Sequence, residues 1–309
     1  MTEAYETGRV IRGLGGSFTV QTEKGDCYTC RAKGTLKRND GRLLVGDIVR
    51  LRLSENEREG VLVSEIFVRR NALIRPPLAN VTVMVLALSG AYPAPSLSTV
   101  DKLLCICAHA GIAPVLAVTK NDLAPEESRQ LSALYSKAGY PTFVLSSVNC
   151  EGVDALREYL RSEMSEGGIA AFAGASGVGK STLLTALFPS LALETGTLSE
   201  KTERGRHTTR HVELFPFAGG FVADTPGFSL LDFEHFDFFA LEDLSSTFPD
   251  FAPYLCGCRY DDCTHTKEEG CALLAAVAEG RVAKSRHDTY LELYEILKAK
   301  KNTYPKRPR

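Results

Sequence analysis

The chain has 309 residues, which suffices for two or three domains and excludes a single small module. Hydrophobic residues make up 44% of it and charged residues 24%, a balance that permits buried cores and excludes global disorder. The net charge of -2 argues by itself against a nucleic-acid partner. Residues 1–75, however, hold 14 Lys and Arg against 10 Asp and Glu, and the last dozen residues are also basic. Both ends therefore carry an excess of positive charge that could bind phosphate. A solvated strand face at the N-terminus and a soluble tail at the C-terminus would show the same excess of charge.

Five short apolar segments alternate with polar residues near the N-terminus, and turns that contain glycine separate them. They lie at residues 8–11, 17–21, 26–32, 46–53 and 60–67. Five strands in so small a unit predict a β-barrel of the OB-fold type, which commonly binds nucleic acid. An SH3-like barrel or a small sandwich would give the same pattern. Pro76 and Pro77 mark the boundary that follows.

From residue 81 the pattern changes to alternating strands and helices. Buried apolar runs predict strands at residues 81–88, 113–118, 141–147 and 169–173. Helical spacing occurs at residues 97–110, 130–138 and 153–164. This alternation predicts a parallel sheet with helices on both faces. Near Leu231 the pattern changes again, to an aromatic cluster (Phe233, Phe236, Phe238 and Phe239), a Cys- and His-rich segment and a helical stretch at residues 290–297.

The longest apolar run, residues 81–88, is too short to span a bilayer. The first residues lack the basic and apolar regions of a secretion signal. We therefore expect a cytoplasmic protein with no membrane partner, and a monomer. Nine cysteines are an odd number, and four of them lie within residues 256–271, which in a reducing compartment indicates metal ligands rather than disulfides.

A phosphate-binding loop follows the predicted strand at residues 169–173. The pattern G-x-x-x-x-G-K-[ST] is satisfied, in the required strand-loop-helix context, by Gly174, Ala175, Ser176, Gly177, Val178, Gly179, Lys180 and Ser181, with Thr182 next in the chain. The glycines let successive backbone N–H groups face a phosphate, and the following helix adds its positive end. Lys180 would reach the terminal phosphates, and the Ser181 hydroxyl would ligate magnesium.

Two further segments complete a triphosphate site. Asp224 ends a second apolar strand and forms D-x-x-G with Gly227, which is typical of the second switch of a GTPase. Asp224 would supply a carboxylate to the coordination shell of magnesium, and the Gly227 N–H would lie where it can sense a γ-phosphate. Between the two motifs, Thr209 or its neighbour Thr208 would complete magnesium coordination, unless the two are polar threonines at a strand edge.

The base-reading motif is Thr119-Lys120-Asn121-Asp122, which follows the predicted strand at residues 113–118. Asp122 can accept two hydrogen bonds from the N1–H and 2-amino groups of guanine, an edge that adenine lacks. Asp122 could equally cap a helix before Pro125. Ser146 and Ser147, after the next predicted strand, would place a backbone N–H near the guanine oxygen.

The order of these motifs is unusual, because base recognition precedes the phosphate loop. A parallel sheet brings its loops to the C-terminal edge of the strands, so the site can form in either chain order. The sequence therefore predicts a circularly permuted GTPase domain. Its D-x-x-G switch leads almost directly into the Cys- and His-rich segment, so the nucleotide state could affect the conformation of that segment.

Cys258, Cys263, His265 and Cys271 offer three sulfurs and one imidazole, enough for a closed, structural Cys3His zinc site. Cys256 is a possible substitute ligand. Cys27 and Cys30 lack a second pair and are expected to be strand thiols.

The catalytic group is the least defined part of the site. Phe228 stands where many GTPases carry glutamine after D-x-x-G, and it cannot orient water. We therefore expect slow intrinsic hydrolysis. His207 is the available replacement as catalytic residue, since imidazole can relay a proton near neutral pH. The alternative is a surface histidine in a mobile loop.

Together these motifs resemble the RsgA or YjeQ family, the circularly permuted GTPases that depend on the small ribosomal subunit. The resemblance covers nearly the whole chain and rests also on segments in the barrel, in the following linker, and around His207 and the cysteines, at residues 8–11, 45–47, 69–71, 75–76, 79–80, 205–209, 262–265 and 270–271. It implies an OB-fold domain at residues 1–70, a permuted α/β GTPase domain at 71–232 and a zinc-binding helical domain at 233–309. Carried over by position, the zinc ligands are those named above and His207 is the catalytic histidine.

The resemblance further implies binding to the small (30S) ribosomal subunit and its rRNA, GTP hydrolysis stimulated by it, and a role in late 30S maturation, with Mg²⁺ and one Zn²⁺ as cofactors. Thr119 departs from the asparagine of many members and loses an amide that can brace the phosphate loop. Glu268-Glu269 replaces a usual Glu-Pro pair. Two rival functions are a P-loop ATPase or kinase of small-molecule metabolism and a nucleotide-gated RNA-binding scaffold with negligible hydrolysis.

Overall fold

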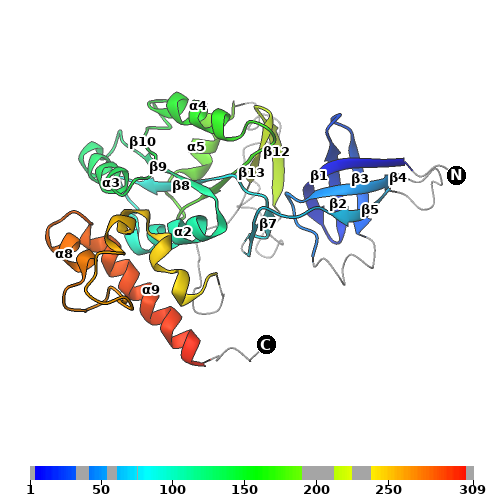
Figure 1. The fold of residues 1–309 in the computed structure, drawn as a ribbon. Coiled ribbons are helices and arrows are strands. Elements are labelled where there is room, and N and C mark those ends of the chain that lie inside the picture. Colours follow the sequence, from blue (N-terminus) through cyan, green and yellow to red (C-terminus); the bar gives the residue numbers. More distant parts are fainter. Residues whose placement is uncertain are drawn as a thin grey trace. The chain divides into compact units, whose positions relative to one another are not determined.

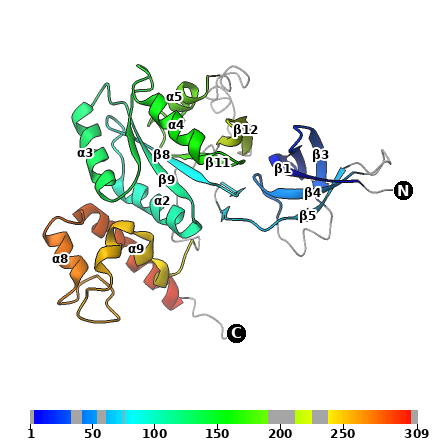
Figure 2. The ribbon, with the colours of Figure 1, turned by 45° about the horizontal axis from the view of Figure 1, so that its top comes forward.

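The computed structural model describes residues 4–32, 42–53, 61–74, 76–189, 212–224 and 238–303. The chain forms two compact units. The first comprises residues 1–84, 157–173 and 187–228, and the second comprises residues 85–156, 174–186 and 229–309. Figures 1 and 2 show the elements in two views. Among the helices of the described ranges, none is both long enough and apolar enough to cross a membrane.

The N-terminal segments of the first unit form a closed five-stranded barrel (Figure 1). Its strands are β1 (Ala4–Leu14), β2 (Ser17–Thr22), β3 (Cys27–Ala32), β4 (Ile48–Leu53) and β5 (Val61–Ile66). They pair in the order β1-β2-β3-β5-β4, and β4 pairs back with β1. Only the β3–β5 pairing within this barrel is parallel. Each strand was expected from the sequence, and the closure confirms the barrel over the sandwich.

Valine and leucine side chains fill the barrel. The side chains of Val10, Val20, Val49, Leu51 and Val63 are fully buried. Alternate residues of a strand share one face, so the residues between these inward-pointing side chains point to the outside of the barrel. Burying each such side chain stabilises the barrel by roughly 1.5–3 kcal/mol.

A buried carboxylate fastens the segment that leaves the barrel. Asp47 is fully buried and accepts hydrogen bonds from Arg69, from Nε at 2.6 Å and from Nη2 at 2.8 Å. Gly46 has a φ of 91°, and a Cβ there would lie 2.1 Å from the Ala79 carbonyl oxygen, so only glycine fits. The short strands beside it are β6 (Ala72–Leu73) and β7 (Leu78–Ala79). Several of these residues also carry the family resemblance. Their structural role is to hold the linker that follows the barrel against the loop at residues 46–47.

Three further strands belong to the first unit. β11 (Ile169–Ala173) is completely buried and pairs in parallel with β13 (Gly220–Asp224), which pairs antiparallel with β12 (Glu213–Phe217). β12 also pairs with β1, where Arg12 lies opposite Glu213. The continuous apolar sequence of β11 reflects burial on both faces, which is typical of parallel strands.

The second unit contains strands that lie in the order β10-β9-β8. They are β8 (Val83–Ser89), which begins in the first unit, β9 (Ala113–Thr119) and β10 (Thr142–Val144); the last two are parallel. The helices that alternate with strands along the chain are α2 (Leu97–Ala110), α3 (Pro125–Lys137), α4 (Val153–Glu163) and α5 (Lys180–Leu187). The alternation confirms the predicted α/β fold. α3 begins before its predicted start because its first turn is polar and opens with proline, which suits a first helical position.

The C-terminal segment packs short helices against one long helix (Figure 2). Its elements are η1 (Leu241–Asp243), η2 (Ser245–Thr247), η3 (Pro249–Tyr254), α8 (Ala272–Ala278) and α9 (Lys284–Thr303). Phe248 and Phe251 stack at 4.6 Å between ring centroids, and Tyr290 of α9 packs edge-on to both. α9 is longer than the stretch expected from apolar spacing. Of the predicted aromatic cluster, Phe233 and Phe236 lie outside the described residues.

Candidate nucleotide site and metal centre

The phosphate-binding sequence forms the loop that joins β11 to α5. Gly174 has a φ of 148°, and a Cβ on it would lie 2.3 Å from the Ala87 carbonyl oxygen, so the position requires glycine. α5 begins at Lys180, and Ser181 and Thr182 are exposed in its first turn. A helix start with free N–H groups and exposed hydroxyls is suited to bind phosphate and its cation.

Lys180 lies against the loop that it belongs to. Its Nζ donates hydrogen bonds to the carbonyl oxygens of Gly174 at 2.6 Å and Ala175 at 2.8 Å. Burial lowers the pKa of Lys180 below its ordinary value. An ammonium group forms stronger bonds with anionic phosphate oxygens than with neutral carbonyls, so a phosphate can replace these partners.

The base-reading loop is bound directly to the phosphate loop. Thr119 is buried, and its Oγ1 donates to the Val178 carbonyl oxygen at 2.5 Å. Lys120 Nζ donates to the carbonyl oxygens of Gly177 and Tyr92, each at 2.7 Å. Two motifs that lie more than 50 residues apart in the chain are thus brought together, as the permuted arrangement requires. Thr119 braces the phosphate loop with its hydroxyl.

Asp122 is exposed beyond Lys120, and Asn121 anchors the loop because its N–H donates to the Leu145 carbonyl oxygen at 3.2 Å. The capping alternative for Asp122 is wrong, since the residue that caps α3 is Ala124 and no side chain bonds to the helix start. Ser146 is buried, and its Oγ accepts the Asn149 N–H at 3.3 Å. Ser147 follows it, half-buried. The carboxylate of Asp122 therefore does not cap α3.

His207, Thr208, Thr209 and Gly227 lie outside the described residues, as does Phe228. Asp224 is the last residue of β13, where its backbone pairs with Glu213. Their assignment to catalysis, magnesium and the γ-phosphate stays a prediction.

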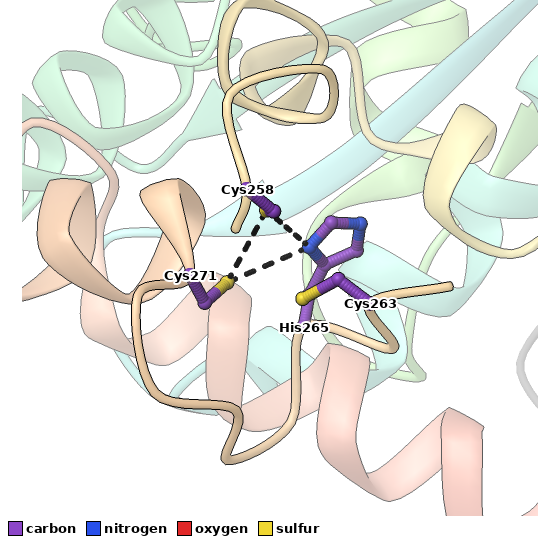
Figure 3. Close-up of side chains that lie close together, drawn as sticks. All are labelled: Cys258, Cys263, His265 and Cys271. Atoms are coloured by element: carbon purple, nitrogen blue, oxygen red, sulfur yellow. Dashed lines mark hydrogen bonds between the residues drawn. The ribbon is translucent and has the colours of Figure 1, made fainter. Parts of the chain in front are cut away.

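The second predicted site comes together near the C-terminus. The ligand atoms of Cys258, Cys263, His265 and Cys271 all lie within 4.8 Å of one another (Figure 3). Cys258 Sγ lies 3.5 Å from His265 Nδ1 and 3.8 Å from Cys271 Sγ, and Cys271 Sγ lies 3.6 Å from His265 Nδ1. A tetrahedral zinc ion with bonds of about 2.3 Å to sulfur and 2.05 Å to nitrogen gives separations of about 3.8 Å and 3.6 Å. The donor set therefore fits one zinc ion.

Neighbouring groups hold this cluster in place. Glu268 accepts hydrogen bonds from the N–H groups of Thr264, Thr266 and Lys267 at 2.9–3.0 Å. Burial alone would raise its pKa, but these bonds and the Thr264 hydroxyl lower the pKa of Glu268 to about 2. His287 of α9 lies 2.9 Å from the His265 carbonyl oxygen. Glu268 thus holds together the loop that carries His265.

Burial shifts the pKa values of two residues of the cluster. Burial lowers the pKa of His265, which favours the neutral imidazole that binds metals. Burial raises the pKa of Cys263 to about 12, so this thiol needs a nearby positive charge to ionise. Cys256 is exposed and is not part of the cluster, and Cys27 is an exposed strand residue while Cys30 is buried in the barrel.

Sequence reasoning missed two supports of these sites. The Tyr92 carbonyl oxygen, which accepts from Lys120, has no signal in the sequence because any residue supplies a carbonyl. His287, which contacts the metal loop, lies on a helix without a motif around it. Only the folded chain brings these residues to the sites.

Comparisons with known proteins agree with this geometry. The model of the RsgA GTPase family matches residues 66–234, and that of the RsgA N-terminal domain matches residues 7–62. A protein of Halalkalibacterium halodurans named small ribosomal subunit biogenesis GTPase RsgA is 39% identical over 94% of this chain and 97% of its own length. One of the same name from Bacillus velezensis is 40% identical over 96% of this chain and 99% of its own length.

Two solved structures are similar over nearly their whole length. YjeQ from Thermotoga maritima has a TM-score of 0.78 and 30% identity, covering 95% of this chain and 99% of its own. YloQ, described as a circularly permuted GTPase, has a TM-score of 0.75 and 30% identity, covering 99% of this chain and 97% of its own. The order of motifs, the contacts between them and these matches lead to one conclusion: the chain belongs to the RsgA family of circularly permuted GTPases.

Proposed function

We propose that this protein binds the small ribosomal subunit, hydrolyses GTP when the subunit stimulates it, and assists late maturation of that subunit. The observation that carries the GTPase part is the bonding of Thr119 and Lys120 to the phosphate loop, because it joins a guanine-reading motif to a triphosphate site. The ribosomal part is supported by the names of the relatives, which match nearly the whole chain. The N-terminal barrel is the proposed contact with rRNA.

Within the site, the phosphate loop binds the phosphates and the motif that ends in Asp122 reads guanine, with Ser146 and Ser147 beside it. Ser181 and Thr209 hold magnesium, whose charge would stabilise the transferring phosphoryl group. Asp224 and Gly227 respond to the γ-phosphate. His207 orients or deprotonates the attacking water, a role supported by the absence of the usual glutamine at Phe228.

The Cys3His cluster binds one structural zinc ion, because all four of its donors belong to the chain and no position is left for a substrate. We assign the barrel to residues 1–70, the GTPase domain to 71–232 and the zinc domain to 233–309. The protein is proposed to be cytoplasmic and monomeric, which light scattering on a sizing column would test.

The direct test of the function is GTP turnover with and without purified small ribosomal subunits. We expect slow turnover by the protein alone and a large acceleration by the subunits, absent for ATP and absent with Lys180→Ala. Lack of acceleration, with intact GTP binding, would support the scaffold instead. Equal use of ATP would support the small-molecule ATPase or kinase.

The zinc assignment is tested by metal analysis of the purified protein. We expect about one zinc per chain, retained by Cys256→Ser and lost by Cys258→Ser. The two cysteines lie two residues apart, but only Cys258 belongs to the cluster. Equal zinc content in both variants would contradict the ligand set.

A further inference from the structure

A buried group of charges lies in the second unit, away from both sites. Arg286 of α9 is 1% exposed, and its guanidinium donates to Asp101 of α2 at 2.8 Å and to Asp250 of η3 at 2.6 and 3.1 Å. It also donates to the Tyr140 hydroxyl at 3.2 Å and lies over the Phe248 ring at 4.9 Å. One arginine therefore joins the C-terminal helices to α2 and to the segment that follows α3.

A second, more exposed contact joins the same two helices. Glu292 of α9 accepts a hydrogen bond from Ser98 Oγ and forms an ion pair with Lys102 Nζ, each at 2.5 Å. Asp101 thus lies between two α2 residues that α9 also binds. α9 consequently holds the first half of α2, the half nearest the loop that precedes it.

That loop is part of the nucleotide site. Ser96 caps α2 and ends the loop that follows β8, and the Tyr92 carbonyl oxygen of the loop accepts from Lys120. A Cβ built on Gly177 would lie 3.5 Å from Pro93 Cδ, so the loop packs beside the phosphate loop. Gly90 at its start donates its N–H to the Thr119 carbonyl oxygen at 3.1 Å. The position of α2 therefore affects the first two residues of the base-reading motif, Thr119 and Lys120.

The charge group is suited to fix that position. Two carboxylates and one guanidinium, nearly removed from water, must stay together because an unpaired buried charge is strongly unfavourable. Burial lowers the pKa of Arg286, yet the bond to Asp250 and the neighbouring charges outweigh it, so the pKa is raised above the ordinary value. The arginine remains charged throughout the physiological pH range, and its planar fork satisfies partners on α2, on η3 and in the segment after α3 at once.

We propose that Arg286 is a positioning residue for guanine-nucleotide binding: from the C-terminal helix it fixes α2, and through α2 it fixes the loop that supports Lys120 and Gly177. This inference rests on the proposed function of the site. It extends the residues that matter for nucleotide binding to α9, which contains none of the predicted nucleotide-binding residues. Because the supported residues belong to the base-reading motif and the phosphate loop, which GTP and GDP both use, the two nucleotides are affected alike.

The test uses Arg286→Lys in the full-length protein, since lysine keeps the charge but lacks the planar fork whose separate nitrogens reach Asp101 and Asp250 at once. We expect the dissociation constants of GTP and GDP to rise by the same factor, about 5- to 20-fold, with turnover at saturating GTP unchanged. Lys102→Met, which breaks only the exposed contact between the same helices, serves as the control and should stay within about twofold of the parent. Zinc content and melting temperature verify that each variant is folded.

A second readout needs no nucleotide. Hydrogen exchange of the Gly90 and Ala91 amides should be faster in Arg286→Lys and unchanged in Lys102→Met. Unchanged affinity together with unchanged exchange overturns the inference, and so does a loss of turnover without a loss of affinity. If Arg286→Lys does not fold, Asp101→Asn is used with the same expectations. Failure of the proposed function would appear differently, as equal binding of ATP with the exchange effect preserved.

Discussion

Removing the hydroxyl of Thr119 should weaken binding of every guanine nucleotide. In Thr119→Val the shape of the side chain is kept, but the bond to the Val178 carbonyl oxygen at 2.5 Å is lost in a position that is 1% exposed. A buried carbonyl without a partner costs about 1–3 kcal/mol, which corresponds to a factor of about 5 to 150 in an equilibrium constant. We expect an effect in the lower half of this range, because the free protein also loses the bond.

The assay is titration with fluorescent GTP and GDP analogues, beside Thr119→Ser and Thr119→Asn. Serine keeps the hydroxyl and asparagine supplies an amide N–H that can donate in its place, so both should bind within a few-fold of the parent chain, whereas valine should not. Binding by Thr119→Val as tight as that of the parent would refute the bracing role. A weakening of GTP alone, with GDP unaffected, would also refute it, because the brace lies away from the γ-phosphate end.

Three further predictions concern stability and ligand binding. Asp47→Asn should lower the free energy of unfolding by about 1–3 kcal/mol, because it removes the negative charge and one of the two oxygens that accept from the partly exposed Arg69. Glu65→Gln, which breaks an exposed ion pair, should change it by less than about 1 kcal/mol, and urea unfolding would show equal losses if burial did not matter. Because the folded-state pKa of Glu268 is depressed to about 2, its stabilisation is present above the ordinary value of 4.5 and is lost as the pH falls between these values, so the stability difference from Glu268→Gln should vanish on acidification. Lys180→Ala should remove GTP binding while the melting temperature changes little, and retained affinity would contradict its place in the phosphate loop.

Local patterns predicted most of the fold. The apolar run of β11 and the alternating segments of the barrel are signals that need only a few neighbouring residues, and both appear as expected. The boundaries were less certain where burial is one-sided. α3 begins with a polar turn at Pro125, and α9 has polar residues on much of its surface, so apolar spacing marked only part of each.

The sites were predictable where a motif is continuous in sequence. The phosphate loop, the base-reading motif and the four metal ligands each lie within a short stretch, so spacing alone identifies them. The partners that hold them are distant. Arg286 and Asp101 are 185 residues apart, and Lys120 and Tyr92 are 28 apart and meet through a backbone carbonyl. Such contacts depend on the packing of elements, which no local pattern encodes.

The measurement that most directly tests the central claim is the nucleotide preference of Asp122→Asn. The parent chain should bind GTP and exclude both ATP and xanthosine triphosphate. In the variant, an amide that donates toward the 2-oxo group of xanthine replaces a carboxylate that accepts from guanine, so GTP should weaken by more than about 100-fold while xanthosine triphosphate binds better. If the variant still prefers GTP over xanthosine triphosphate as strongly as the parent does, the base is read elsewhere and the account of this site is wrong.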